Sequence, residues 1–67
     1  MTIDRYIGRV VNIVYIDKKG RITQRRIEIK AVVDGHIRAH CFKSKGPRVF
    51  AVENVLAFEL VNRHAGG

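Results

Sequence analysis

The chain has 67 residues and carries thirteen Lys and Arg against six Asp and Glu, which gives a net charge of +7 and a pI near 10.4. A chain of this length forms one small domain that buries only ~60% of its unfolded surface. A single cysteine excludes a disulfide framework within the chain and a cysteine-based metal site. We expect one domain over residues 1–61 and a disordered tail at 62–67.

The excess of positive charge favours polyanionic partners, with nucleic acid first. Surface solvation alone is the ordinary alternative. No signal-peptide pattern, long apolar run or amphipathic helix is evident. Together with the unpaired Cys41, these features predict a cytoplasmic protein without a membrane partner.

The first seven residues fit an arm, a half-strand or a single helical turn. Residues 8–16 are rich in Val and Ile, which predicts a strand with apolar residues on both faces. Asp17–Gly20 then predicts a hairpin turn, in which Gly20 supplies a positive φ and Asp17 bonds forward to the backbone.

Residues 21–33 alternate clearly and predict a half-buried antiparallel strand. Its core face is predicted to carry Ile27, Ile29, Ala31 and Val33, and its solvent face Gln24, Arg26, Glu28 and Lys30. The Asp34-Gly35 dipeptide predicts a tight hairpin turn.

Site-like side chains concentrate between residues 35 and 55. One face of the first run carries His36, Arg38, His40 and Phe42, whereas Ile37, Ala39 and Cys41 form its apolar face. A basic turn at 43–47 contains Lys43 and Lys45, and Arg48, Phe50 and Val52 then line one face of a second run. If the two runs pair, we expect the imidazoles, guanidiniums and rings to gather on one sheet surface.

Glu53 and Asn54 interrupt the last strand-like stretch and predict one turn of 3₁₀ helix before a final strand at 56–61. About five short strands in so short a chain predict an all-β fold, a small SH3/Sm-like barrel. The expected core contains Ile13, Ile27, Ile29, Ile37, Val52 and Leu56.

The order of these segments resembles the WYL domain of bacterial transcription regulators. The matching segments are Val14–Gly20 (VYIDKKG), Thr23–Glu28 (TQRRIE), Ile37–Cys41 (IRAHC), Arg48–Phe50 (RVF) and Val52–Val55 (VENV). The tripeptide that names the family falls at Gly35-His36-Ile37, where only the third position keeps its apolar character. Asn54 replaces the Arg that the family tends to have.

This resemblance implies a short, stand-alone SH3/Sm-like barrel whose basic groove senses a nucleotide or nucleic acid and controls transcription. Carried over by position, Arg48 is the first binding candidate, followed by Arg26 and His36. We expect Arg48 to lie near His36 and Arg26 on neighbouring strands. Arg38, His40, Lys43 and Lys45 add positive or titratable groups, and Phe42 offers a ring for base stacking.

Catalytic and metal sites are not indicated. His36 and His40 share a strand face, but no third metal ligand is evident, and we expect an unliganded pair. Cys41 faces away from His40, so no base activates its thiol, and we expect neither an enzyme nor a cofactor. Besides the nucleic-acid or nucleotide module, the sequence leaves open an assembly module, in which a sheet edge pairs with a second copy or with a regulator protein.

Overall fold

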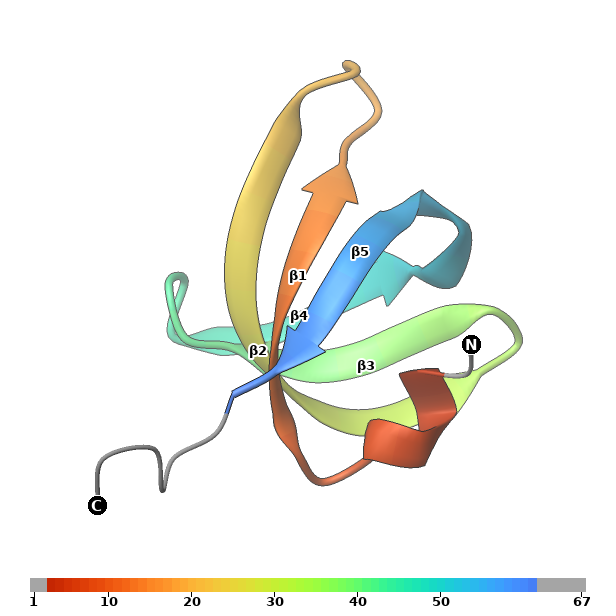
Figure 1. Ribbon diagram of the computed structural model, residues 1–67, viewed down its shortest axis with the longest axis vertical. Coiled ribbons are helices and arrows are strands. Elements are labelled where there is room, and N and C mark those ends of the chain that lie inside the picture. The colour runs from red at the N-terminus through yellow and green to blue at the C-terminus, as the bar shows by residue number, and fades with distance from the viewer. Residues whose placement is uncertain (1–2, 62–67) are drawn as a thin grey trace.

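The computed structural model describes residues 3–61, and the predicted tail lies outside the described residues. Within them, the strands are β1 (Val10–Ile16), β2 (Ile22–Val33), β3 (His36–Cys41), β4 (Gly46–Ala51) and β5 (Val55–Leu60). Two short 3₁₀ turns, η1 (Ile3–Tyr6) and η2 (Val52–Asn54), precede β1 and β5 (Figure 1). The all-β fold and the turn before the last strand are confirmed, and the N-terminal segment forms the helical turn among its three alternatives.

The strands form one antiparallel sheet in the order β4-β3-β2-β1-β5. The long strand β2 bends between its two partners, so that the sheet curls around one core (Figure 1). The edges β4 and β5 do not share a ladder, but Tyr15 joins the two halves. Its hydroxyl accepts a hydrogen bond from the Ala51 N–H at 3.0 Å, and its ring packs edge-on against Phe50. The result is an open SH3/Sm-like barrel.

The core is apolar, and its buried side chains come from η1 and from strands β1 to β4. Among the described residues, the buried side chains are Ile3, Val11, Ile13, Ile27, Ile29, Ile37, Ala39, Cys41 and Phe50. The four isoleucines predicted for the core are confirmed. Val52 is only partly buried, although it packs against this cluster. The prediction for Leu56 is wrong, because it lies on the edge strand β5 and is 51% exposed.

A bulge in β2 corrects the predicted face of the second half of that strand. The register shifts between Ile29 and Ala31, which adds one residue to β2 relative to β3. Beyond this point Val32 pairs with Ile37 and packs against the core, whereas Val33 is 52% exposed. Uninterrupted alternation therefore assigns Ala31 and Val33 to the wrong face.

The first two hairpin turns follow the predicted chemistry. The Asp17 carboxylate accepts hydrogen bonds from the N–H groups of Lys19 at 2.8 Å and Arg21 at 2.9 Å. Gly20 has a φ of 79°. Asp34 and Gly35 have φ values of 51° and 75°, the two positive angles that a tight two-residue hairpin requires.

The third turn is shorter than predicted, because β4 already begins at Gly46. Pro47 therefore lies within a strand. It is tolerated there because β4 is an edge, where a missing N–H removes no ladder bond.

Candidate functional site

The register between β3 and β4 divides the predicted basic face. Ala39 pairs with Arg48, and directly paired residues share a face of a sheet. Arg48 therefore belongs to the face that carries the buried Ala39. Arg38, with His36 and His40, lies on the opposite, outer face, so the predicted gathering on one surface is wrong.

The expected proximity of Arg48, His36 and Arg26 is not found either. His36 pairs with Ala51, three residues along β4 from Arg48, or ~10 Å along an extended strand. Arg26 lies on β2, where its Nε donates a hydrogen bond to the Asn12 side chain at 3.3 Å. The three residues therefore do not form one site.

Arg38 and Arg48 nevertheless border the same groove, which crosses β2, β3 and β4. This groove, here called the basic groove, has a volume of about 530 Å³ and is lined by Lys30, Ala31, Arg38, Ala39, Pro47, Arg48 and Val49. Lys30 is the extra residue of the bulge in β2 and directly precedes Ala31, the residue that pairs with Arg38. The adjacent strands β2, β3 and β4 each contribute one cation to this groove. Neighbouring strands are ~5 Å apart, so the three cations lie near one another.

The basic groove has no acidic side chain in its lining. Within residues 3–61 a single salt bridge is present, from Lys30 Nζ to Glu28 Oε1 at 3.3 Å. This pair is solvent-exposed and is worth at most ~1 kcal/mol, so an anion can displace it. Arg38 and Arg48 are exposed and have no ion pair in this part of the chain.

Phe42 and Arg26 border a separate and smaller hollow. It has a volume of about 280 Å³ and is completed by Val10 and Val61. Phe42 is 41% exposed, and its ring meets the His40 ring edge-on at a centroid distance of 5.1 Å. Part of the Phe42 ring is thus accessible for the base stacking that the sequence suggests.

The remaining predicted residues lie outside both hollows. Lys43 and Lys45 are exposed in the turn after β3. His36 is exposed beside the β2–β3 turn, where its Nδ1 lies 3.0 Å from the Asp34 carbonyl oxygen. These side chains add positive or titratable groups near the sheet without lining a groove.

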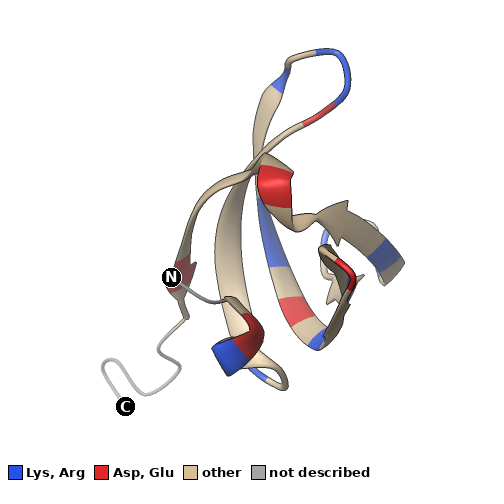
Figure 2. Cartoon of the chain, turned by 90° about the vertical axis from the view of Figure 1, so that its right-hand side faces the viewer, with Lys and Arg blue, Asp and Glu red and all other residues tan. Residues whose placement is uncertain are grey.

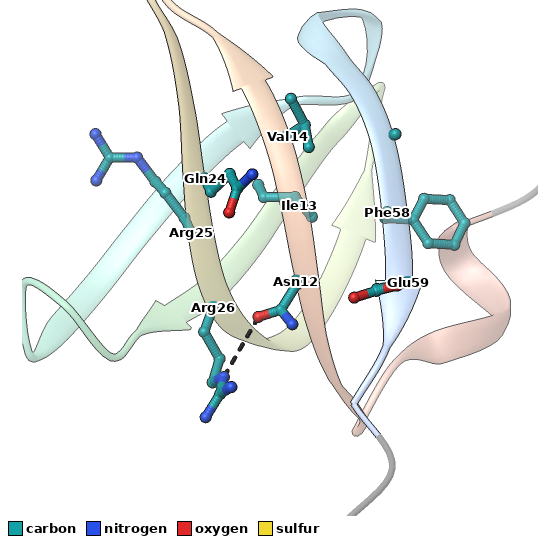
Figure 3. A pocket seen from close by; sticks show the side chains of 9 residues that line it. Asn12, Ile13, Val14, Gln24, Arg25, Arg26, Phe58 and Glu59 are labelled. Carbon is teal, nitrogen blue, oxygen red and sulfur yellow. Dashed lines mark hydrogen bonds between the residues drawn. The ribbon is translucent and has the colours of Figure 1, made fainter.

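A polar groove that the sequence analysis missed crosses β5, β1 and β2. Its volume is about 550 Å³, and Figure 3 shows Asn12 and Glu59 on neighbouring strands, with Arg26 reaching Asn12. Asn12 pairs with both Arg26 and Glu59, so a cation and a carboxylate flank one carboxamide. Only the strand register brings these residues together. Because the Glu59 carboxylate offsets one of its two arginines, Arg25 and Arg26, this groove favours an anion less than the basic groove does.

The Cys41 thiol is buried at the end of β3, next to the turn that leads into β4. Burial raises the pKa of this thiol. Hydrogen bonds from the Ser44 hydroxyl, from the backbone of Ser44 and Lys43 and from Arg25 act against burial and lower the pKa from 9.0 to about 7. Polar groups that bond to the thiolate thus outweigh the cost of burying its charge.

We expect the ultraviolet absorbance of the Cys41 thiolate to titrate with a midpoint near pH 7 in the folded protein. Because the folded pKa lies below the unfolded one, Cys41 stabilises the fold fully above pH 9.0 and loses this contribution as pH falls through 7. Ser44→Ala should raise the midpoint. A midpoint at 9.0 or above in the wild-type chain would contradict this account of the turn.

Other site types find no support in the described residues. No group of three His, Cys, Asp or Glu side chains within residues 3–61 is placed to hold a metal ion. Cys41 is buried in the core, whereas His40 lies on the outer face of β3. In the same range, neither helical turn has the length and apolar character needed to cross a bilayer.

Comparison with known proteins identifies the fold. No family model and no curated protein matches the sequence. Among solved structures, proteasome accessory factor B/C (PafBC) of Arthrobacter aurescens aligns with 91% of this chain at a TM-score of 0.72 and 23% identity. The chain spans 10% of that protein's length. This similarity shows that the chain shares its fold with part of PafBC, and it supports a WYL-like fold.

Proposed function

We propose that this chain is a non-catalytic regulatory module that binds an anionic ligand, a nucleic acid or a nucleotide, through the basic groove. One observation carries the proposal: Lys30, Arg38 and Arg48, from three adjacent strands, border one groove without an acidic side chain in its lining. Arg forms forked hydrogen bonds to phosphate oxygens, and Lys adds a compact point charge. This set of groups suits phosphate better than a neutral ligand.

The electrostatics of the free groove favour an anion. Cations on neighbouring strands repel one another, and a bound phosphate removes this repulsion. The net charge of +7 also attracts polyanions and accelerates their encounter with the protein. Figure 2 shows that Lys and Arg also occupy the tip of the β1–β2 hairpin, and no residue of this tip lines the basic groove. These outlying cations add long-range attraction without adding a defined contact.

The regulatory part of the proposal is supported by the resemblance to WYL domains. The fold shared with part of PafBC is consistent with a regulatory module. The same resemblance suggests a bacterial protein that acts in the cytoplasm in transcription regulation.

We expect Arg48→Ala to weaken binding of a fluorescent single-stranded oligonucleotide by ~1.5–3 kcal/mol, the range for a charge-assisted contact. The melting temperature should hardly change, because the Arg48 side chain is exposed. Fluorescence anisotropy measures the affinity, and a thermal melt measures the stability. Competition with unlabelled ATP distinguishes a nucleotide ligand from a polymer.

Arg21→Ala provides the matched control. Arg21 is also exposed, lies next to the β1–β2 turn, and loses the same charge on substitution. The affinity of Arg21→Ala for the oligonucleotide should change by less than about twofold, because this charge acts only at long range. Equal losses for the two variants would show that net charge alone drives binding. An Arg48→Ala variant that melts much earlier but binds normally would show that Arg48 is structural.

A further inference from the structure

The two edges of the sheet differ in their free hydrogen-bonding groups. On β4, the Ala51 N–H points away from β3 and donates to the Tyr15 hydroxyl. Because ladder bonds alternate along a strand, Val49 and Pro47 face the same free edge. Proline has no N–H and the Ala51 N–H is already bonded, so Val49 carries the one free N–H of this edge within β4. Such an edge resists the addition of another strand.

The β5 edge lacks this protection. The Val61 N–H bonds to the Val10 carbonyl of β1 at 3.0 Å, so the alternation directs Glu59 and Ala57 toward β1 as well. Phe58 and Leu60 therefore direct their N–H and C=O groups outward. No backbone hydrogen bond from another turn or loop within residues 3–61 meets them.

Side chains on β5 also favour strand pairing. Leu56 and Leu60 are 51% and 38% exposed, and residues 55–60 contain no Lys, Arg or Pro. Natural edge strands are usually protected by such residues, by covering segments or by bulges. A bulge at Leu56, which has no partner on β1, interrupts the start of β5, whereas residues 57–60 stay in regular pairing and leave that part of the edge open.

We propose that β5 pairs antiparallel with β5 of a second copy of this chain, around a two-fold axis at Phe58. The distribution of charge favours a second copy as the pairing partner, because β5 contains no Lys or Arg although the protein has a net charge of +7. Two strongly basic copies therefore meet with least repulsion at this edge.

Charge also selects the register of the pair. With the axis at Phe58, Glu59 faces Ala57 of the partner subunit within the regular part of β5, residues 57–60. With the axis one residue later, the two Glu59 carboxylates face each other directly, which is unfavourable. In the favoured register these carboxylates lie on a diagonal, ~7–8 Å apart, where salt screens them.

This dimer leaves the basic groove of each copy free. The groove lies on β2, β3 and β4, whereas the interface uses β5 at the other edge of the sheet. The interface is isologous, so assembly stops at two copies. A dimer thus presents two basic grooves to one polyanion, and linked sites raise the apparent affinity.

Sedimentation velocity over a concentration series of the 67-residue chain tests the proposal. We expect a reversible dimer for the wild type, and a dissociation constant at least about tenfold weaker for Leu60→Lys. Leu56→Lys, at a more exposed position, serves as a second variant if Leu60→Lys fails to melt cooperatively. Val49→Lys on the protected β4 edge is the matched control and should leave the dissociation constant unchanged.

Ala57→Lys tests the register. It places a cation opposite Glu59 of the partner subunit, so the dimer should tighten several-fold at low salt and lose this gain at high salt. Weaker association of Ala57→Lys would overturn the register. A wild-type chain that stays monomeric up to about 1 mM, or a loss with Val49→Lys equal to that with Leu60→Lys, would overturn the dimer.

Discussion

Ile29→Ala is expected to lower the free energy of unfolding by ~2–5 kcal/mol. The Ile29 side chain is fully buried, and its backbone pairs with Ala39 on β3 beside the bulge. Truncation removes apolar contacts and leaves a cavity that the stiff sheet fills poorly. The total free energy of unfolding of a domain of this size is only about 3–10 kcal/mol. The melting temperature of Ile29→Ala should therefore fall by more than about 10 °C.

Val33→Ala is the matched control on the same strand. Val33 lies beyond the bulge and is 52% exposed, so its truncation should cost less than about 0.5 kcal/mol. Thermal and urea melts of both variants measure the difference. A large loss of stability for Val33→Ala, together with a small loss for Ile29→Ala, would place Val33 in the core and contradict the register shift in β2.

Local chemistry explains why the strands and turns were predictable from the sequence. Asp17 and Gly20 specify the first hairpin through a carboxylate acceptor and a positive φ, and Asp34-Gly35 specifies the second in two residues. These signals act over four residues or fewer. The alternating Ile residues fix which face is buried as long as the pairing is regular.

Register is where prediction from the sequence failed. The extra residue in β2 turns Val32 toward the core. No residue type in this segment indicates the position of the bulge. The same limit applies to the site. The sequence identifies Arg38 and Arg48, but not that the pairing of Arg48 with Ala39 places them on opposite faces of the sheet while both border one groove. Lys30 is solvent-exposed, as expected, but the sequence does not indicate that it borders the same groove as Arg38 and Arg48.

The larger functional effect is expected for the combined variant Lys30→Ala, Arg38→Ala and Arg48→Ala. It removes the three cations of the basic groove and leaves the exposed lysines of the β1–β2 turn in place. Because these side chains are exposed, the fold should persist. Affinity for a single-stranded oligonucleotide at low salt should fall by about a thousandfold or more, since three charge-assisted contacts of ~1.5–3 kcal/mol each are removed.

The triple variant Lys18→Ala, Lys19→Ala and Arg21→Ala is its control. It has the same net charge, and all three of its sites lie in or beside the β1–β2 turn. We expect it to retain most of the wild-type affinity. An equal loss in the two triple variants would assign binding to overall charge and not to the groove.

The most direct test of the basic groove is the salt dependence of oligonucleotide binding, measured by anisotropy for the wild type and the groove variant. The wild type should lose affinity log-linearly with salt, because phosphate contacts release counterions. Removing three contacts should reduce the magnitude of that slope by about 2, since each contact to a single strand contributes ~0.7. Wild-type affinity independent of salt, or a groove variant with an unchanged slope and affinity, would contradict the assignment of the basic groove as the binding site.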